Sequence, residues 1–286
     1  ELGEVIAAFR KMYDQISEAI SKRKQAEQAL QRSLTQVEEY SRALNAELEK
    51  GRQMQVNFLP NQLLQLPGWE TAALFKPARQ VAGDFYDVFQ IPGGSIGIVV
   101  ADVIGHGISA ALLMTTVRAL LRQRVTMETD IARIVTDVNH ELARDVAASG
   151  RFMTMFFLKI EPESQTLNWV RAGHEPAILY NAEDDIFLEL AGEGMAMGVD
   201  ENLSYQKNSH EEWSPGSIVV VGTDGIRETQ NANGEMFGIN RFRTAIRKHA
   251  AESAEQIKSR IIADLKEFQG EAPQEDDITL VVVKFL

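Results

Sequence analysis

The sequence predicts an α+β sandwich that is preceded by one long N-terminal helix. Residues 1–58 repeat apolar side chains with the seven-residue period of a coiled coil. After them come strands, two helices, more strands, two further helices and a closing strand. Paired helices between runs of short strands are typical of antiparallel sheets covered by helices, and they argue against a doubly wound sheet. The 286 residues, 44% of them hydrophobic, can fill such a core.

The N-terminal helix follows an unbroken heptad frame from residue 2 to residue 58. Apolar side chains occupy most of its a and d positions: Leu2, Ile6, Phe9, Tyr13, Ile16, Ile20, Leu30, Leu34, Val37, Leu44, Leu48 and Phe58. Arg23 and Glu27 interrupt this seam midway, and Gly51 and Gln55 loosen it near its end. A helix of this length spans roughly 85 Å, too long to pack on one domain. We therefore expect a homodimer through residues 1–58, serving either as a dimerisation element or as a signalling coiled coil.

The first residues indicate where such a signal would originate. The stretch from Glu1 to Met12 resembles the end of a HAMP domain, which couples a membrane sensor to a cytoplasmic output module. The chain starts with neither an initiator Met nor a signal peptide, and it has no run of about 18 apolar residues. We therefore expect a cytoplasmic fragment of a longer, membrane-anchored sensor protein.

A second domain is expected from residue 59 to residue 286. Pro60 ends the helix, and Pro67 with Gly68 forms a turn. Helices are expected over 108–124, 129–147, 240–249 and 253–268, the second with Thr129 or Asp130 as its N-cap. Strands are expected over 70–76, 84–90, 95–101, 153–160, 166–172, 177–181, 186–190, 203–213, 217–222 and 278–285.

Cysteine content and charge exclude several classes of function. Without cysteine, the chain has no thiolate nucleophile, no disulfide and no thiolate-bound metal. Any metal must be held by carboxylate, imidazole or carbonyl groups, which favours hard ions such as Mg²⁺ or Mn²⁺. The net charge of −12 arises within residues 61–286, and it argues against nucleic acid as a partner.

Four aspartates share a similar local setting. Asp84, Asp102, Asp224 and Asp276 each lie at a strand end or in a turn, beside small or polar residues. A single aspartate in such a place is ordinarily a turn former or a helix cap. Four of them gathered together would repel one another unless cations held them. The residues alone therefore indicate a carboxylate metal site and leave open whether the four converge.

Five motifs in order carry a resemblance to a known family. They are Val81-Ala82-Gly83-Asp84-Phe85-Tyr86-Asp87, Ala101-Asp102-Val103-Ile104-Gly105-His106-Gly107, Ala172-Gly173-His174-Glu175-Pro176, Gly222-Thr223-Asp224-Gly225 and Glu275-Asp276-Asp277-Ile278-Thr279. Together they resemble the PPM family of metal-dependent protein serine/threonine phosphatases, and within it the bacterial RsbU/SpoIIE-like branch. The resemblance covers about residues 55–286. It implies an αββα sandwich, in which two antiparallel sheets pack face to face between paired helices.

The resemblance also implies a metal centre with two Mn²⁺ or Mg²⁺ ions. Asp84 would contact one ion, and Asp102 would bridge both. The backbone carbonyl of Val103 would complete a coordination shell, while Asp224 and Asp276 would hold the other ion. Asp277 ranks below Asp276 as a ligand. A metal-activated water would then release phosphate without a covalent enzyme intermediate, which is compatible with a chain that lacks cysteine.

Other polar residues near these motifs are weaker candidates. Arg79 is a candidate phosphate-binding residue, because a guanidinium group matches a phosphate bidentately; a solvated arginine is the alternative. His106 invites a role as a general acid, but it lies four residues after Asp102 where eukaryotic members have a histidine two residues after the bridging aspartate, so a polar turn residue is the better interpretation. His174 is expected to be a hydrogen-bonded structural histidine.

The resemblance implies a substrate and a form of control. The usual substrate in this branch is a phosphorylated STAS-domain anti-sigma-factor antagonist, so the output would be sigma factor regulation. In related enzymes the helices that lead into the core reposition metal ligands, so activation could run through residues 40–66. One alternative is a pseudophosphatase that acts as a binding module. A more remote one is a nucleotide cyclase, because residues 83–85 superficially resemble a diguanylate cyclase signature.

Overall fold

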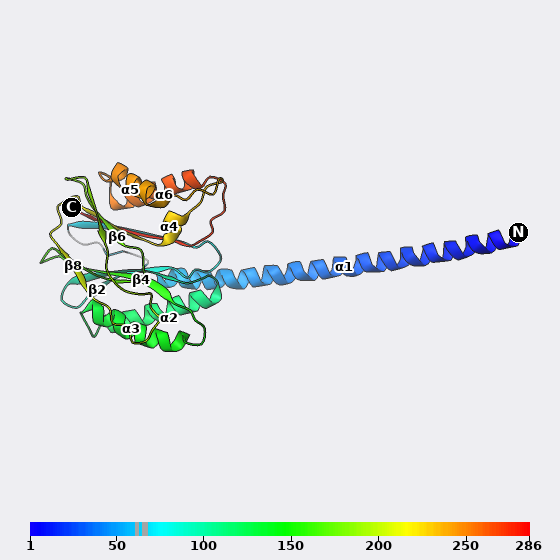
Figure 1. Cartoon of the computed structure of the whole chain (residues 1–286), viewed down its shortest axis with the longest axis horizontal. Coiled ribbons are helices and arrows are strands. Elements are labelled where there is room, and N and C mark those ends of the chain that lie inside the picture. Colours follow the sequence, from blue (N-terminus) through cyan, green and yellow to red (C-terminus); the bar gives the residue numbers. More distant parts are fainter. Residues whose placement is uncertain (61–62, 65–67) are drawn as a thin grey trace. The chain divides into compact units, whose positions relative to one another are not determined.

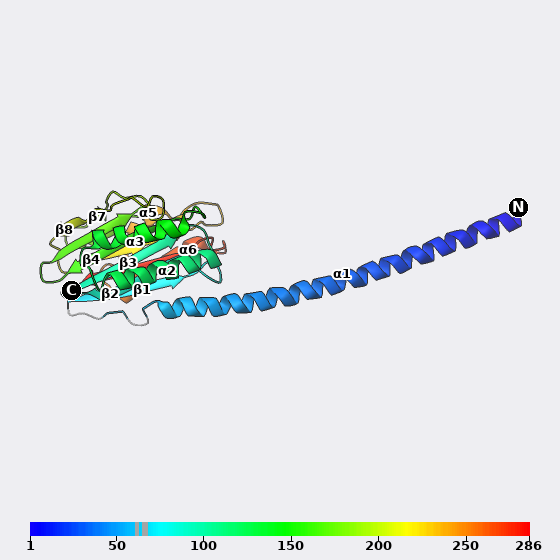
Figure 2. The same ribbon diagram turned by 90° about the horizontal axis from the view of Figure 1, so that it is seen from below.

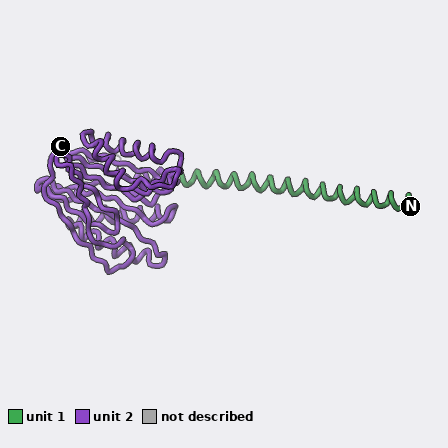
Figure 3. Tube along the Cα trace, turned by 45° about the horizontal axis from the view of Figure 1, so that its top comes forward, with its two compact units in different colours: residues 1–50 green, residues 51–286 purple. Residues whose placement is uncertain are grey.

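The computed structural model describes residues 1–60, 63–64 and 68–286, which form two compact units, residues 1–50 and 51–286 (Figure 3). Helix α1 (Leu2–Phe58) supplies the first unit, and its last turns belong to the second. Part of the segment 40–66, and Pro67 of the expected turn, lie outside the described residues. The functional division at residue 58 stays a prediction.

Unit 1 consists of one helix with an exposed apolar seam. Seam residues such as Phe9, Ile16 and Leu34 are exposed in the single chain. Arg23 and Glu27, which interrupt the seam, form an i,i+4 ion pair with each other at 2.8 Å. Such an exposed pair contributes little to stability. Because the seam is exposed in the single chain, only a partner could bury it. No helix within the described ranges is both long and apolar enough to cross a membrane.

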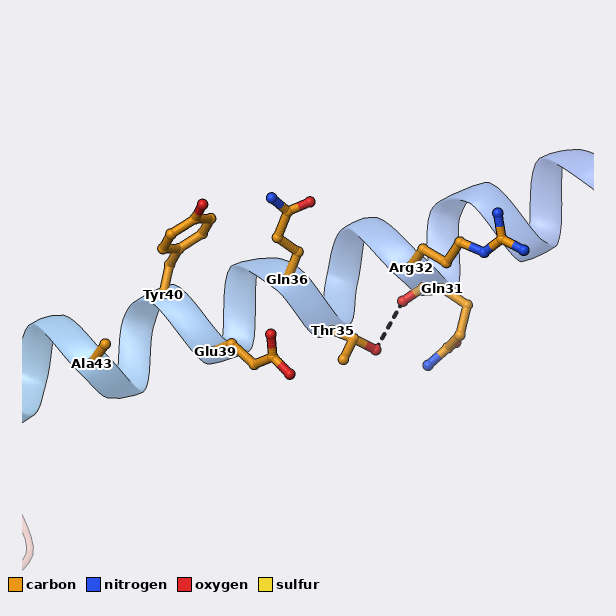
Figure 4. A pocket seen from close by; sticks show the side chains of 7 residues that line it. All are labelled: Gln31, Arg32, Thr35, Gln36, Glu39, Tyr40 and Ala43. Carbon is orange, nitrogen blue, oxygen red and sulfur yellow. Dashed lines mark hydrogen bonds between the residues drawn. The ribbon is translucent and has the colours of Figure 1, made fainter.

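The side of α1 away from the seam is polar. Gln31, Thr35, Glu39 and Tyr40 are among the seven residues that line a shallow hollow on this one helix (Figure 4). The Thr35 hydroxyl donates to the carbonyl of Gln31 at 3.0 Å, which is the back-bonding that threonine adopts within helices. A hollow on a single helix cannot enclose a ligand, so we assign it no function.

Unit 2 is a sandwich of two five-stranded antiparallel sheets. One sheet has the strand order β1-β10-β9-β6-β7, and the other has the order β2-β3-β4-β5-β8. The strands are β1 (Trp69–Lys76), β2 (Phe85–Ile91), β3 (Ser95–Val103), β4 (Met153–Glu161), β5 (Thr166–Ala172), β6 (Ala177–Asn181), β7 (Ile186–Leu190), β8 (Asn208–Glu211), β9 (Ile218–Gly222) and β10 (Ile278–Phe285). The sheets face each other, and the chain passes from one to the other after β1, β5, β7 and β8.

Helices cover the two outer faces in pairs, as Figures 1 and 2 show. Helices α2 (Ile108–Arg124) and α3 (Ile131–Val146) cover the sheet that contains β3. Helices α5 (Gly238–His249) and α6 (Ala254–Gln269) cover the sheet that contains β10, and the short α4 (Asp224–Glu228) follows β9. The predicted αββα sandwich is therefore confirmed.

Two apolar cores account for this layering. The larger core lies between the sheets and beneath α2 and α3, and it includes the fully buried Phe85, Phe156 and Phe157. The smaller core lies under α5 and α6 and includes Ile246 and Ile261. Strands β9 and β10 contribute to both cores because their side chains alternate between the two faces of their sheet. Burial on both faces explains why these strands are continuous apolar runs.

Several local predictions need adjustment. The strand expected over 203–213 is reduced to Asn208–Glu211, an edge strand that pairs only with β5 among the described strands. The N-cap of α3 is Asp130, whose carboxylate accepts from the Ala132 backbone at 3.0 Å. Helix α4 was not expected, because five residues are too few to show a helical period.

Candidate metal centre

Two of the predicted ligands lie at one end of the sheet that contains β3. Asp84 directly precedes β2, and Asp102 is the penultimate residue of β3. The two strands are antiparallel, with Phe85 opposite Ala101. The start of β2 therefore meets the end of β3, and the register brings the two aspartates together.

The other two predicted ligands lie at an end of the facing sheet. Asp224 begins α4, two residues after the end of β9, and Asp276 lies two residues before β10. Because Gly222 is opposite Leu280 in an antiparallel pair, the end of β9 meets the start of β10. Each sheet thus supplies two carboxylates, and all four come from strand ends.

The electrostatics show that the two pairs face each other. Burial, together with the charges of Asp224 and Asp276 in the facing sheet, raises the pKa of Asp102 from 3.8 to about 7. Burial also raises the pKa of Asp84 well above its ordinary value, with added contributions from Asp102 and Asp277. Burial and the charge of Asp276 raise the pKa of Asp224. The site therefore holds more negative charge than its own groups neutralise.

Asp84 is fixed by a hydrogen bond from the opposite sheet. Its side chain is buried, and its Oδ2 accepts from the Thr223 hydroxyl at 2.8 Å. The same hydroxyl accepts from the Thr279 backbone N–H at 3.1 Å, and the Thr223 N–H donates to the Thr279 carbonyl at 3.0 Å. Thr223 therefore links Asp84 to both β9 and β10 beside the other two aspartates.

Asp277 has a different role from its neighbour. One of its carboxylate oxygens accepts from the Ala78 N–H at 2.8 Å, and the other accepts from the Gly83 N–H at 2.9 Å. Its buried carboxylate thus holds the segment that leads to Asp84. Asp276 instead accepts from the Asp277 N–H through Oδ1 at 2.8 Å. Asp277 is placed as a support of the site, in keeping with its lower rank as a ligand.

Two glycines permit close backbone approach at the site. A Cβ atom at Gly83 would lie 2.8 Å from the carbonyl oxygen of Val103, so this predicted ligand atom is next to the residue that precedes Asp84. A Cβ atom at Gly225 would lie 2.0 Å from the carbonyl oxygen of Asp277. Any other residue at either position would push apart neighbouring strand ends within one sheet, β2 from β3 at Gly83 and β9 from β10 at Gly225.

The donor set fits hard divalent cations. Asp84, Asp102, Asp224 and Asp276 offer oxygen ligands with a clear excess of negative charge, the chemistry that Mg²⁺ and Mn²⁺ prefer. Within the described residues, no three acidic or histidine side chains are already arranged around one ion position. Mg²⁺ commonly keeps several water ligands and takes only one or two carboxylates, so a preformed three-residue cluster is not required.

The weaker candidates are placed as follows. Arg79 is exposed in the loop between β1 and Asp84, and His106 is exposed in the turn before α2. His174 is buried, and its Nδ1 lies 2.7 Å from the Thr154 hydroxyl. Burial lowers the pKa of His174 to about 3, so the ring is neutral at physiological pH. The structure thus brings His174, but not Arg79 or His106, into a buried hydrogen-bonded position.

Two residues near the site were missed as contributors. Gln55 is the one buried residue among those described in α1; its amide donates to the Ala82 carbonyl at 2.9 Å and accepts from the Ala82 N–H at 3.1 Å. From the sequence alone, a glutamine at this position predicts only a weaker coiled-coil seam. Arg151 donates from Nη1 to the Ile104 carbonyl at 3.2 Å, directly after Val103. No local pattern marks either residue, because both partners are distant in sequence.

Comparison with curated proteins gives relatives along most of this chain. Protein IcfG of Synechocystis sp. is 33% identical over 268 residues, covering 83% of this chain and 41% of IcfG. Phosphoserine phosphatase RsbU of Bacillus subtilis is 28% identical over 241 residues, covering 84% of this chain and 70% of RsbU. The chain therefore spans less than half the length of IcfG.

Solved structures share the fold. The SiaA-PP2C domain of Pseudomonas aeruginosa matches with a TM-score of 0.76 and 24% identity, covering 86% of this chain and 98% of that domain. The RsbU and RsbW domains of Rv1364c from Mycobacterium tuberculosis match with a TM-score of 0.65 and 22% identity, over 79% of this chain and 61% of that one. RsbX, solved in complex with magnesium, matches with a TM-score of 0.59 and 18% identity, over 79% of this chain and 99% of RsbX.

The fold is that of the solved PP2C domain of SiaA. The family model for stage II sporulation protein E (SpoIIE) matches residues 92–286. The chain belongs to the SpoIIE family. The match begins after Asp84 but includes the other three predicted aspartate ligands.

The charge excess predicts that Asp102→Asn stabilises the metal-free protein. The Asp102 carboxyl binds its proton more tightly in the folded protein than in the unfolded chain, so the parent loses stability as pH rises from about 4 to about 7. In buffer with EDTA at pH 8, we expect the variant to gain on the order of 2 kcal/mol in free energy of unfolding, and less at pH 5. Urea unfolding followed by tryptophan fluorescence measures the difference.

The matched control for this measurement is Asp145→Asn, an exposed aspartate in α3, which should leave stability unchanged at both pH values. A loss of stability in Asp102→Asn at pH 8 would contradict the prediction, because it would show that neighbouring groups of the protein already stabilise the ionised Asp102 carboxylate.

Proposed function

We propose that this domain is a Mn²⁺- or Mg²⁺-dependent phosphoserine and phosphothreonine protein phosphatase. The single observation that carries the proposal is the convergence of four mutually interacting aspartates from the strand ends of both sheets. Asp84, Asp102, Asp224 and Asp276, with the Val103 carbonyl, would hold two ions. When bound, the ions supply an activated water and neutralise charge on the phosphoryl oxygens.

The chain's own residues orient this chemistry. Thr223 fixes the Asp84 carboxylate, and Asp277 fixes the backbone on which Asp84 is carried. Groups that are held in place before the reaction need not reorganise during it, which is the main source of electrostatic catalysis. Arg79 is exposed in the adjoining loop and remains our candidate for contacting the substrate phosphate.

We predict that activity depends on the metal and on the aspartates. Hydrolysis of p-nitrophenyl phosphate should be absent in EDTA and should appear on addition of Mn²⁺. Asp102→Asn and Asp224→Asn should each lower kcat by about 100-fold or more, because both remove a ligand from the ions that activate the water. Asp145→Asn, an exposed position in α3, should retain parental activity.

The same assay decides the pseudophosphatase alternative. All four predicted ligand positions hold aspartate, which favours the enzyme over the binding module. A folded parent protein that shows no Mn²⁺-dependent turnover would establish the binding module in place of the enzyme. A cyclase would carry its signature on a β-hairpin. Residues 83–85 instead lie at the open end of the β2–β3 hairpin, away from its turn at residues 92–94, so the cyclase alternative has no support.

For the substrate, we propose a phosphorylated STAS-domain antagonist of an anti-sigma factor. RsbU and RsbP of Bacillus subtilis are both named phosphoserine phosphatases, and the chain covers 70% and 57% of their lengths. One matching solved structure carries RsbU and RsbW domains in a single chain. Dephosphorylation of such a STAS-domain protein, compared with free phosphoserine, tests this substrate class. Equal rates on both would contradict it.

We further propose that a membrane sensor controls the domain through α1. The HAMP-like first residues suggest this input, and the domain would then work in the cytoplasm. Gln55 supports the route, because its two hydrogen bonds hold Ala82, which is two residues before Asp84. A shift or rotation at this end of the helix would be passed along a short, hydrogen-bonded segment to a metal ligand.

We predict that Gln55→Leu changes catalysis without unfolding the domain. Loss of both hydrogen bonds frees the backbone before Asp84, so the Mn²⁺ concentration at half-maximal activity should change by about threefold or more. Gln53→Leu, at an exposed position on the same helix, is the matched control and should behave as the parent. Identical Mn²⁺ dependence in Gln55→Leu and the parent would remove this route of control.

The exposed seam predicts a dimer through residues 1–58. Leu34→Cys introduces the only thiol in the chain and should form a disulfide-linked dimer under mild oxidation. Thr35→Cys, on the polar side drawn in Figure 4, should cross-link much more slowly. Ile16→Asp should lower the dimer fraction in analytical ultracentrifugation, because a charge in the seam opposes its burial. A monomeric parent would contradict the expectation.

A further inference from the structure

The loop over residues 173–176 is one of the connections that carry the chain from one sheet to the other. Strand β5 ends at Ala172 in the sheet of Asp102, and β6 begins at Ala177 in the sheet of Asp224. The register places Gly173 beside Met155 at the start of β4, and it places Ile178 opposite Val220 near the end of β9. The loop therefore crosses between the sheets at the end that holds the aspartates.

The His174 side chain lies between these two strand ends. Its Nδ1 is 2.7 Å from the hydroxyl of Thr154, and Thr154 is the direct cross-strand partner of Asp102. On its other side the ring lies beside the backbone of Gly222, which lies two residues before Asp224, but its buried Nε2 makes no hydrogen bond within the described residues. The residue is only 2% exposed, so its bond to Thr154 does not compete with solvent. One imidazole thus binds the cross-strand partner of Asp102 and lies beside the backbone that leads to Asp224.

Contacts from the rest of the loop hold the imidazole in place. Arg171 donates from Nε to the His174 carbonyl and from Nη1 to the Gly192 carbonyl, the latter at 2.9 Å. The Gly173 N–H donates to the Gly194 carbonyl at 2.9 Å. Gly173 has a φ of +70°, and a Cβ atom there would lie 2.7 Å from the Ala196 nitrogen, so only glycine fits.

The loop also contacts the element that begins with Asp224. The Glu175 carboxylate forms an ion pair with Arg227 of α4, whose first residue is Asp224. The His174 ring therefore lies beside the backbone before Asp224, at Gly222, and the Glu175 carboxylate pairs with the guanidinium group of Arg227 after it. These contacts are independent of the hydrogen bonds that Thr223 and Asp277 make around Asp84.

We infer that His174 is a positioning residue that sets the separation between Asp102 and Asp224 across the two sheets. The inference rests on the proposed metal centre, in which these two aspartates share the ions. Two catalytic ions lie roughly 3.5–4 Å apart, so the ligands on the two sheets must keep a fixed separation. A misplacement of about 1 Å can cost on the order of 100-fold in rate. The ring would act through Thr154 and Gly222 and would not touch the substrate.

The test compares His174→Ala with a matched pair at its partner, Thr154→Val and Thr154→Ser. We expect His174→Ala and Thr154→Val to raise the Mn²⁺ dissociation constant measured by calorimetry about tenfold. Their kcat on p-nitrophenyl phosphate should fall by about 10–100-fold with KM nearly unchanged. Thr154→Ser keeps the hydroxyl and should remain close to the parent. His210→Ala is the control, because His210 lies in the edge strand β8 of the sheet that contains Thr154, and it should behave as the parent.

A second readout needs no metal. Hydrogen exchange of the metal-free protein should become faster in His174→Ala and in Thr154→Val at residues 153–156 and at residues 220–224. Exchange in α5 and α6 should remain unchanged. Unchanged exchange at both strand ends, or Mn²⁺ affinity equal to that of the parent, would overturn the inference. If the parent itself binds no Mn²⁺, the proposed metal centre fails, and exchange alone then decides whether His174 joins the sheets. If His174→Ala does not fold, Thr154→Val supplies the same comparison.

Discussion

The repulsion among four aspartates is the constraint on which the rest of this structure depends. Asp84 and Asp102 come from one sheet and Asp224 and Asp276 from the other; Asp84 is buried, Asp102 and Asp224 are half-buried, and Asp276 is exposed. Such an arrangement costs stability in the metal-free protein, and bound cations would offset that cost. The ends of the two sheets meet here, so the same contacts that close the sandwich also support the proposed metal centre.

Hydrogen bonds and tight backbone contacts hold these strand ends together despite the repulsion. Thr223 joins Asp84 to β9 and β10, and Asp277 uses both oxygens to hold the segment before Asp84. Glycines at 83 and 225 allow strand ends to approach more closely than any side chain would permit. The supports lie in different elements from the ligands that they hold, so the geometry of the site is a property of the whole sandwich.

Much of the fold could be predicted because it depends on local patterns. Heptads indicated the long helix, and apolar runs with turn residues indicated most strands of both sheets. The four aspartates could be singled out because each follows or precedes such a run. Their convergence, however, depends on strand pairing between distant segments, such as Gly222 with Leu280. Resemblance to a family supplied that step, which residue spacing could not.

What the sequence could not indicate are the supporting contacts. Gln55 looked like a defect in a coiled-coil seam, yet it is buried against Ala82 in the folded unit. Asp277 ranked below Asp276 as a ligand, and both of its oxygens accept hydrogen bonds from backbone N–H groups. Both roles depend on partners distant in sequence, for which composition and periodicity carry no signal.

The central claim is that two ions are held between the strand ends of the two sheets. Anomalous diffraction from crystals grown with Mn²⁺ tests it most directly. The account predicts two anomalous peaks roughly 3.5–4 Å apart, with Asp102 in contact with both and with Asp84, Asp224 and Asp276 as further ligands. Crystals soaked to saturation that show no peak within reach of these aspartates would contradict it.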